Sequence, residues 1–334
     1  MPITSRDVAR LAGVSQPTVS RALRGDPRVA AETRARVQEA VTALGYVPSE
    51  AGRSLVTRRT RRIGIVVSDL TNPFYPHLLG PLHDELEQHA YRMMVFTERS
   101  DNQVPLEQLV DGSIDGAVLL TSNIDSLLPG ELQRRRLPFV FLNRESTPHT
   151  ADAAVVDNEL GGRLAANHLT GHGHRRIAGI FGPATTSTGR DRETGFRAAL
   201  AEAGIALPSV FTRRGPFEFE TGYRAMQELL DADPRPTAVF CGNDVVAIGA
   251  LNAALARGVS IPEDIGIIGF DNIPMAEWEA FRLTTVGHDL DAMAAAAARL
   301  LVERLEKKNS DDGPRRIVMT PQLIERATVS DPRP

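Results

Sequence analysis

Apolar runs of strand length alternate with helical stretches from residue 63 onward, and this alternation restricts the fold more than any other feature. A first series comprises RIGIVVSD, RMMVFTE, DGAVLLTS and PFVFLNRE, and a second comprises RRIAGIFGP, PSVFTRRG, TAVFCGND and DIGIIGFD. Strands that are apolar throughout are typical of parallel sheets covered by helices on both faces. The pattern therefore predicts two α/β lobes, each built on a parallel sheet.

Polar and aromatic residues follow the predicted strands. Ligands of open α/β sheets bind beyond the carboxyl ends of the strands. The candidate segments are therefore SDLTNPFY, NRE, STGRDR, PFEF, GND and FDN. Carboxylates, amides, an arginine and aromatic rings converging from two lobes suit a small polyhydroxylated or heterocyclic ligand. At each single position the alternative remains that Asp or Asn merely ends a strand or caps a helix.

The first 62 residues form a basic module. They hold twelve arginines and five acidic residues, a net charge of +7, whereas the whole chain carries −4 and the remainder therefore −11. Such a division of charge is expected when one module neutralises phosphates and the other must not adhere to DNA. A merely arginine-rich surface is the alternative.

Two short helices broken at a glycine are predicted in TSRDVARLAGVSQPTVSRALRG. Thr4 or Ser5 can cap the first helix, Gly13 permits the turn, and Ser15 can cap the second helix. The apolar positions of the first helix share one face: Val8, Leu11 and Ala12.

The second helix would turn its polar side outward, where it suits contacts in a DNA groove. The outward residues are Gln16, Pro17, Thr18, Ser20, Arg21 and Arg24. A third helix follows in AAETRARVQEAVTALG and ends at Gly45. Three helices close one small core, but a DNA-binding helix-turn-helix and a plain helical hairpin both remain open on this pattern alone.

The segments DVARLAGVSQPTVSRAL and TRARVQEAVTALGYVPSEAGRSL resemble the headpiece of the LacI/GalR family of bacterial repressors. The resemblance implies that the second helix enters the major groove, with Gln16, Pro17 and Arg21 at base-reading positions. Arg21 can bond a guanine edge through two N–H groups, whereas Pro17 offers only apolar contact. The DNA-binding residues predicted in this way are Thr4, Ser15, Gln16, Pro17, Thr18, Ser20, Arg21, Arg24, Arg53 and Leu55.

The segment PSEAGRSLVTRRTRR, taken alone, is a basic polar linker. The resemblance implies that residues 49–56 become helical only on DNA and that Leu55 wedges into the minor groove and bends the duplex. Gly52 weakens such a helix by about 1 kcal/mol relative to alanine, which suits a segment that folds on binding. An unstructured tether is the alternative.

The larger part of the chain resembles the effector domain of the same family, which has a periplasmic-binding-protein-like fold. The resemblance rests on SDLTNPFY, VDNELGGRLAANHLTGHGHRRIA, FCGNDVVAIGAL, DIGIIGFDN and LTTVGHD. It implies that Arg192 and Asp271 hold vicinal hydroxyls or a ring edge and that Phe217 stacks on the ligand. Asn143 stands where many relatives carry aspartate. The implied effector-binding residues are Asp69, Asn72, Phe74, Tyr75, Asn143, Arg192, Phe217, Asn243 and Asp271.

These features predict a multi-domain protein with an all-α headpiece and an α/β two-lobed domain. We expect a headpiece at 1–48, a hinge at 49–62, and an effector-binding and dimerisation domain at 63–334. Its first lobe would comprise about 63–158 plus 290–318, and its second about 159–289 plus 319–330.

The predicted function is that of a sequence-specific transcriptional regulator, a repressor in the simplest case. Its operator affinity would be controlled by a sugar or sugar derivative bound between the lobes, with a nucleobase as the second choice. The sign of the response stays open. A homodimer on a palindromic operator is expected, because one short helix makes too few base contacts. RATVSDPRP has no leucine heptads, so no tetramerising coiled coil is expected.

A sugar receptor without a role in gene control and an α/β enzyme are the competing classes. No nucleophile elbow, phosphate loop or metal cluster supports an enzyme, and no cofactor is expected. His168, His172 and His174 have a spacing that suits a metal, but the resemblance gives them a structural role. The opening MPITSRDVAR, the single Cys241 and the lack of a long apolar run predict a cytoplasmic protein without a membrane partner.

Overall fold

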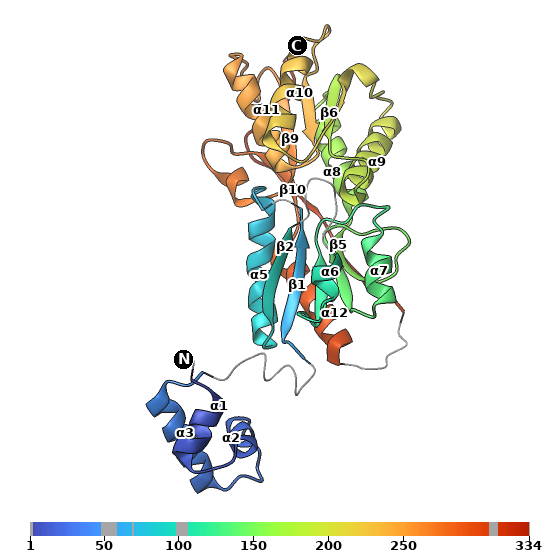
Figure 1. Ribbon diagram of the computed structural model, residues 1–334. Helices are drawn as coiled ribbons and strands as arrows, with labels where there is room; N and C mark the ends of the chain where they lie inside the picture. The colour runs from blue at the N-terminus through green and yellow to red at the C-terminus, as the bar shows by residue number, and fades with distance from the viewer. Residues whose placement is uncertain (1–2, 48–58, 69, 98–105, 307–312, 334) are drawn as a thin grey trace. The chain divides into compact units, whose positions relative to one another are not determined.

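The computed structural model describes residues 3–47, 59–68, 70–97, 106–306 and 313–333 of the 334-residue chain. It divides into two compact units, residues 1–61 and residues 62–334 (Figure 1). Among the described residues, no helix combines the length and apolar character that crossing a membrane requires.

The headpiece is a three-helix unit made of α1 (Ser5–Ala12), α2 (Gln16–Leu23) and α3 (Ala31–Leu44). Gly13 ends α1 with a φ of 64°, the left-handed conformation that makes the sharp turn into α2. The Ser15 hydroxyl accepts a hydrogen bond from the Thr18 backbone N–H and caps α2. The core consists of Val8, Ala9, Ala12, Val19, Ala22, Val29, Val37 and Ala40.

One side chain of the headpiece core was predicted wrongly. Leu11, expected on the inner face of α1, is 56% exposed. The buried stripe of α1 instead runs through Val8, Ala9 and Ala12, so the helix is rotated toward its small residues. Small side chains at Ala9 and Ala12 allow the neighbouring helices to approach closely, which leaves Leu11 outside.

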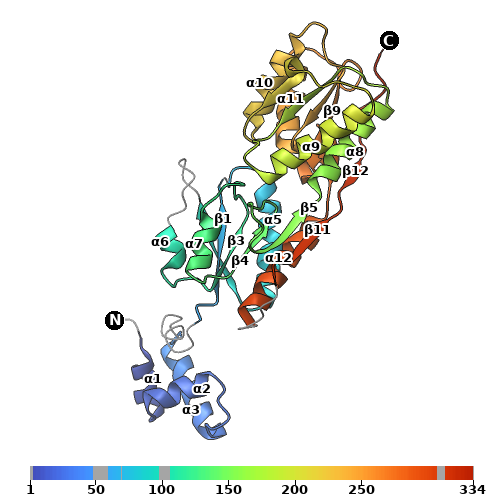
Figure 2. The same cartoon turned by 90° about the vertical axis from the view of Figure 1, so that its right-hand side faces the viewer.

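The larger unit holds two six-stranded sheets. The first has the order β11-β5-β4-β3-β1-β2, and all its neighbouring strands are parallel. Its strands are β1 (Arg62–Val67), β2 (Arg92–Thr97), β3 (Gly116–Leu119), β4 (Phe139–Leu142), β5 (Asp152–Val156) and β11 (Arg316–Met319). The sheet lies between α6 (Leu106–Val110) and α7 (Leu128–Arg134) on one face and α5 (Phe74–Gln88) and α12 (Leu290–Glu306) on the other (Figure 2).

The second sheet has the order β12-β10-β9-β8-β6-β7, in which only the β10–β12 pair is antiparallel. Its strands are β6 (Ile177–Phe181), β7 (Thr212–Arg214), β8 (Ala238–Cys241), β9 (Gly266–Asp271), β10 (Thr284–Gly287) and β12 (Gln322–Ile324). Helices α8 (Asn158–Gly171) and α9 (Ser187–Glu202) cover one face, and α10 (Phe219–Leu230) and α11 (Asp244–Ala256) the other. Short 3-10 turns lie at Ser209–Phe211 and Pro274–Glu277.

Alternate residues of each strand enter different cores, which is the burial pattern expected of sheets covered on both faces. In the second sheet, Phe181 and Phe240 pack toward α8 and α9, whereas Ile180 and Cys241 pack toward α10 and α11. The predicted fold, a helix-turn-helix followed by two α/β lobes with parallel sheets, is thus confirmed, with the antiparallel edge strand β12 as the one addition in the described residues.

Glycines bring the covering helices of the second lobe into direct backbone contact. A Cβ atom at Gly195 of α9 would lie closer than 3.0 Å to the carbonyl oxygen of Glu159 in α8, and one at Gly162 would meet the carbonyl oxygen of Arg192 in the same way. Gly222 and Gly249 make the equivalent close approach between α10 and α11. Both helix pairs therefore depend on the absence of side chains at their crossing points.

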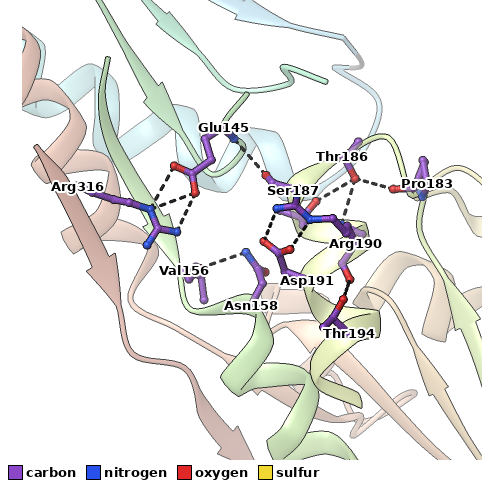
Figure 3. A network of polar contacts seen from close by, with 12 residues as sticks. Glu145, Val156, Asn158, Pro183, Thr186, Ser187, Arg190, Asp191, Thr194 and Arg316 are labelled. Carbon is purple, nitrogen blue, oxygen red and sulfur yellow. Dashed lines mark hydrogen bonds and ion pairs between the residues drawn. The ribbon is translucent and has the colours of Figure 1, made fainter. Parts of the chain in front are cut away.

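The chain passes between the lobes three times, at residue 157, at residues 288–289 and at residues 320–321. Polar contacts also join them (Figure 3). The Glu145 backbone N–H, after β4, donates to the hydroxyl of Ser187 at the start of α9 (3.1 Å). The Glu145 carboxylate binds the Arg316 guanidinium of the first lobe (2.8 Å). The loop after β4 therefore makes polar contacts both within the first lobe and with the second.

Candidate functional site

The outward side of α2 presents the residues expected to meet DNA. Gln16, Pro17, Arg21 and Arg24 are exposed, and Thr18 and Ser20 are partly exposed. Gln16 donates from its amide to the Ser5 hydroxyl (2.9 Å), and Arg24 donates from Nε to the Ser20 carbonyl (3.0 Å). Thr4 is engaged at the start of α1, where its N–H and hydroxyl donate to Asp7 (3.0 and 2.8 Å). Three predicted site residues lie outside the described residues: Arg53, Leu55 and Asp69.

A gap between the lobes gathers the predicted effector-binding residues. All eight that the structure describes line it, and Arg144 and Thr188, which were not predicted, line it too. Its remaining volume is about 10 Å³, room for little more than a water molecule. The lining residues are Asn72, Phe74, Tyr75, Asn143, Arg144, Thr188, Arg192, Phe217, Asn243 and Asp271.

Arg192 is the centre of this gap and is only 3% exposed. Its three donor groups reach different elements: Nε donates to the Asn158 side chain (2.8 Å), Nη1 to the Gly242 carbonyl (2.8 Å) and Nη2 to the Asp271 carboxylate (2.7 Å). The guanidinium also stacks on the Phe270 ring, 3.7 Å from its centroid. Burial lowers the pKa of Arg192, while the charge of Asp271 opposes that change. The guanidinium group of Arg192 is therefore held in one orientation before any ligand binds.

Asp271 stands on a strained turn that other residues support. Its φ is 106° and that of Asn272 is 53°, values that residues with side chains seldom adopt. The Asp244 carboxylate accepts from the Ile273 N–H (2.9 Å) and the Thr285 hydroxyl (2.5 Å), and Arg326 donates to the Asn272 side chain (2.8 Å). These contacts hold the turn from two sides and so fix the Asp271 carboxylate opposite Arg192.

Burial raises the pKa of Asp244 to about 8, and the charge of Asp271 adds to the shift. Because this folded-state pKa lies above the ordinary 3.8, the folded chain holds a proton that the unfolded chain has lost, so stability falls as pH rises from about 4 to about 8. We expect Asp244→Asn to lose this slope, which is at most about 1.4 kcal/mol per pH unit.

The free energy of unfolding at pH 5, 6, 7 and 8, measured by denaturant titration, checks this prediction. The exposed Asp125, whose substitution Asp125→Asn removes a carboxylate at the surface, serves as the control and should leave the profile unchanged. Parallel profiles for wild type and Asp244→Asn would show that Asp244 titrates as an ordinary aspartate.

The Phe217 ring fills the middle of the gap. It is 9% exposed and lies so close to Gly182 that a Cβ atom there would collide with it. Its carbonyl accepts a hydrogen bond from the Asn72 side chain of the first lobe (2.9 Å). On its other side is a cavity of about 650 Å³, whose walls include Pro73, Phe219 and Met275. Movement of this ring or of the lobes is thus required before a sugar-sized molecule can enter.

Sequence reasoning missed several polar groups around the gap. Arg144 follows Asn143 in the quoted segment NRE, so the strand-end rule could have found it. Asp244 ends the quoted segment GND, so the same rule could have found it too. His288 gave no such signal, because it follows β10, which was not among the predicted strands, and its position beside Arg192 depends on contacts between distant segments. Burial lowers the pKa of His288 to about 3, and the charge of Arg192 adds to this effect, so the ring is neutral.

The histidines and the cysteine have structural surroundings. In the described ranges, no three His, Cys, Asp or Glu side chains come together as metal ligands would. His172 pairs with Asp331 (2.8 Å), and His174 lies within hydrogen-bond distance of Thr237 and Ser330 (3.0 and 2.9 Å). Burial raises the pKa of the Cys241 thiol, which keeps it protonated.

Family models match both units. Residues 4–49 match the model of bacterial regulatory proteins of the lacI family, and residues 166–329 match that of the periplasmic binding protein-like domain. The HTH-type transcriptional repressor PurR of Klebsiella pneumoniae is 34% identical over 333 residues, which cover 98% of this chain and 97% of the relative. Its namesake from Erwinia tasmaniensis is 35% identical with the same coverage.

Solved structures of other proteins are similar to the chain as well. The complex of the transcriptional regulator CelR with cellobiose has a TM-score of 0.74 at 32% identity, covering 98% of this chain and 99% of that one. A LacI family regulator from Enterococcus faecium with bound ribose has a TM-score of 0.71 at 29% identity, covering 81% and 99%. The lac repressor dimer bound to operator and the anti-inducer ONPF has a TM-score of 0.88 at 24% identity, covering 99% and 100%, and supports the fold.

Proposed function

The chain belongs to the LacI family of bacterial regulatory proteins, DNA-binding repressors with a ligand-binding core and not enzymes, and from this premise we propose that a sugar or sugar derivative bound between its two lobes controls its affinity for an operator. One observation carries the proposal: residues from both lobes converge on the buried Arg192–Asp271 pair.

The chemistry of the gap suits a polyhydroxylated ring. Asp271 offers acceptors and Arg192 donors in a fixed geometry, so adjacent hydroxyls can donate to one and accept from the other. Phe217 offers an apolar face for the C–H side of a sugar. The solved relatives named with cellobiose and with ribose support a carbohydrate in a domain of this kind.

Regulation follows from the two-lobed arrangement. The Asn72–Phe217 and Glu145–Ser187 bonds join the lobes directly, so a ligand that displaces Phe217 changes contacts that set their arrangement. A ligand shifts the equilibrium only as far as its affinities for the two arrangements differ. We assign residues 1–48 to the DNA-binding headpiece, 49–62 to a hinge in which Leu55 wedges into DNA, and 63–334 to the effector domain.

We also propose that the protein acts as a homodimer on a palindromic operator in the cytoplasm. Two headpieces are needed for a site long enough to be specific. The second lobe exposes large apolar side chains that a second copy could cover, among them Leu255 (58% exposed) and Trp278 (55%). Sedimentation of the full chain should give twice the monomer mass of 36.3 kDa.

Selection of sites from a random DNA library, followed by titration of the selected site with sugars, tests the proposal. A palindromic site whose occupancy responds to one sugar would support it and give the sign of the response. Enrichment of a site whose occupancy responds to a nucleobase and to no sugar would contradict a carbohydrate effector. It would still support a DNA-binding regulator that a ligand controls. No enriched sequence under any condition would contradict specific DNA binding.

Arg21→Ala should weaken binding to the selected site by about 5- to 150-fold, the value of one bidentate base contact. Non-specific DNA affinity should change little, because phosphate contacts supply most of it. Arg10→Ala, which removes the same charge from α1, is the matched control and should keep the ratio of specific to non-specific affinity. Equal ratios for both variants would exclude Arg21 as a base-reading residue.

A further inference from the structure

Several buried polar atoms without partners belong to residues that follow strands of the two sheets, and two of these residues, Asn143 and Arg144, line the gap. Among the described residues these atoms include Thr121 Oγ1, Asn143 Oδ1, Arg144 Nε and both ring nitrogens of His288. Thr121 follows β3, Asn143 and Arg144 follow β4, and His288 follows β10. Buried polar groups are normally paired, so the unpaired Asn143 Oδ1 and Arg144 Nε in the lining of the gap indicate groups that serve a ligand.

The gap carries an excess of positive charge. The guanidinium groups of Arg144 and Arg192 lie 5.5 and 5.8 Å from the centroid of the same Phe217 ring, so both border one space. Among the described residues of the lining, Asp271 is the single acidic one, and its carboxylate is already paired with Arg192. Asn143 adds no charge. Two guanidinium groups against one carboxylate leave a net charge of +1.

Neighbouring acids do not neutralise Arg144, because they are paired with other cations. The carboxylate of Glu145 turns to Arg316 and lies 3.1 Å from His149 Nδ1, and Asp191 pairs with Arg190 (2.6 Å) (Figure 3). Within the parts of the chain that the structure describes, no carboxylate lies at ion-pair distance from Arg144. Burial also keeps the Asp244 carboxyl largely protonated at neutral pH, since its pKa is about 8.

We propose that the effector carries an anionic group, a phosphate or a carboxylate, and that Arg144 binds it. A guanidinium fork matches either group with two parallel hydrogen bonds. The polyhydroxylated part of the same molecule would then lie against Phe217 and the Arg192–Asp271 pair. This inference rests on the proposed function and narrows it from sugars in general to sugar phosphates or acidic sugars.

Inorganic phosphate is the simplest probe, used with the full-length protein. At equal ionic strength, phosphate should raise the melting temperature above that in sodium chloride, by about 2 °C once its concentration exceeds Kd tenfold. Arg144→Gln should lose this shift, and Arg144→Lys should keep part of it because the charge remains. The matched control Arg190→Gln, which removes an arginine that is 45% exposed and paired with Asp191, should keep the whole shift.

Glucose 6-phosphate, gluconate and glucose then distinguish phosphate, carboxylate and neutral ligands, with operator affinity as the readout. A response to one anionic sugar that Arg144→Gln reduces tenfold or more would support the inference. A phosphate shift that persists in Arg144→Gln, or no shift at all, would overturn it. A neutral sugar that acts equally on wild type and Arg144→Gln would overturn it as well, but would leave the proposed control by sugars intact.

Discussion

Replacing Arg192 by alanine is expected to abolish the response of operator binding to the effector while the protein still binds its operator. Arg192 connects Asn158, Gly242 and Asp271 of the second lobe, so its loss would remove the donors that we propose for the ligand and the contact that positions the Asp271 carboxylate. Operator binding depends on the headpiece, which folds around its own core. Operator titration with and without effector measures both quantities.

Stability must be separated from this loss of response. Removing one partner of a buried ion pair costs about 3–5 kcal/mol, because the Asp271 carboxylate would be left unpaired. The double variant Arg192→Met with Asp271→Asn removes the stranded charge and should recover most of that stability without recovering the response. A single variant that is folded and still responds to the effector would show that Arg192 does not belong to the ligand site.

Gly195→Ala is expected to destabilise the protein by about 3 kcal/mol or more. The added methyl group would meet the backbone of α8 at Glu159, and backbone cannot rotate away as a side chain can. Helices α8 and α9 would have to separate. The free-energy cost of that separation exceeds the usual cost of overpacking a core. Since α8 carries Asn158 and α9 carries Arg192, separation would also lengthen the hydrogen bond between them and weaken effector binding.

Gly171→Ala, at the end of the neighbouring helix α8, provides the matched control. A Cβ atom at Gly171 has no neighbour within 4 Å and its φ needs no glycine, so alanine there should be neutral or stabilising by up to about 1 kcal/mol. Denaturant titration of both variants measures the difference. Equal stability of Gly195→Ala and Gly171→Ala would mean that α8 and α9 do not touch as described.

Most of the strands predicted from the sequence are buried along their whole length. Six of the apolar runs became β1, β3, β4, β6, β8 and β9, because such strands are buried on both faces. The run RMMVFTE was also a strand, β2, but it lies at the sheet edge and is half exposed. Four strands were missing from the predicted runs. β11 and β12 are short, border the sheets and bury little apolar surface, so periodicity gave no signal. β5 and β10 are buried throughout but were not recognised as strands.

The candidate site shows where pattern reasoning ends. The eight effector-binding residues that the structure describes do meet in one place, since strand ends of parallel sheets converge. Their functional roles remain predictions. Asp244 and Arg326 support the turn at Asp271, and in the described part of the chain Arg144 has no acidic partner. Both features depend on contacts between segments far apart in the chain. No local pattern of residues encodes such contacts.

The paired glycines have a mechanical consequence. The backbone contacts between α8 and α9 and between α10 and α11 leave the second lobe little room for internal rearrangement. We therefore expect this lobe to move as a rigid body. A displacement caused by a bound molecule would then not be taken up by rearrangement within the second lobe. We therefore expect movement between the lobes to be concentrated at the three short crossings, residue 157, residues 288–289 and residues 320–321.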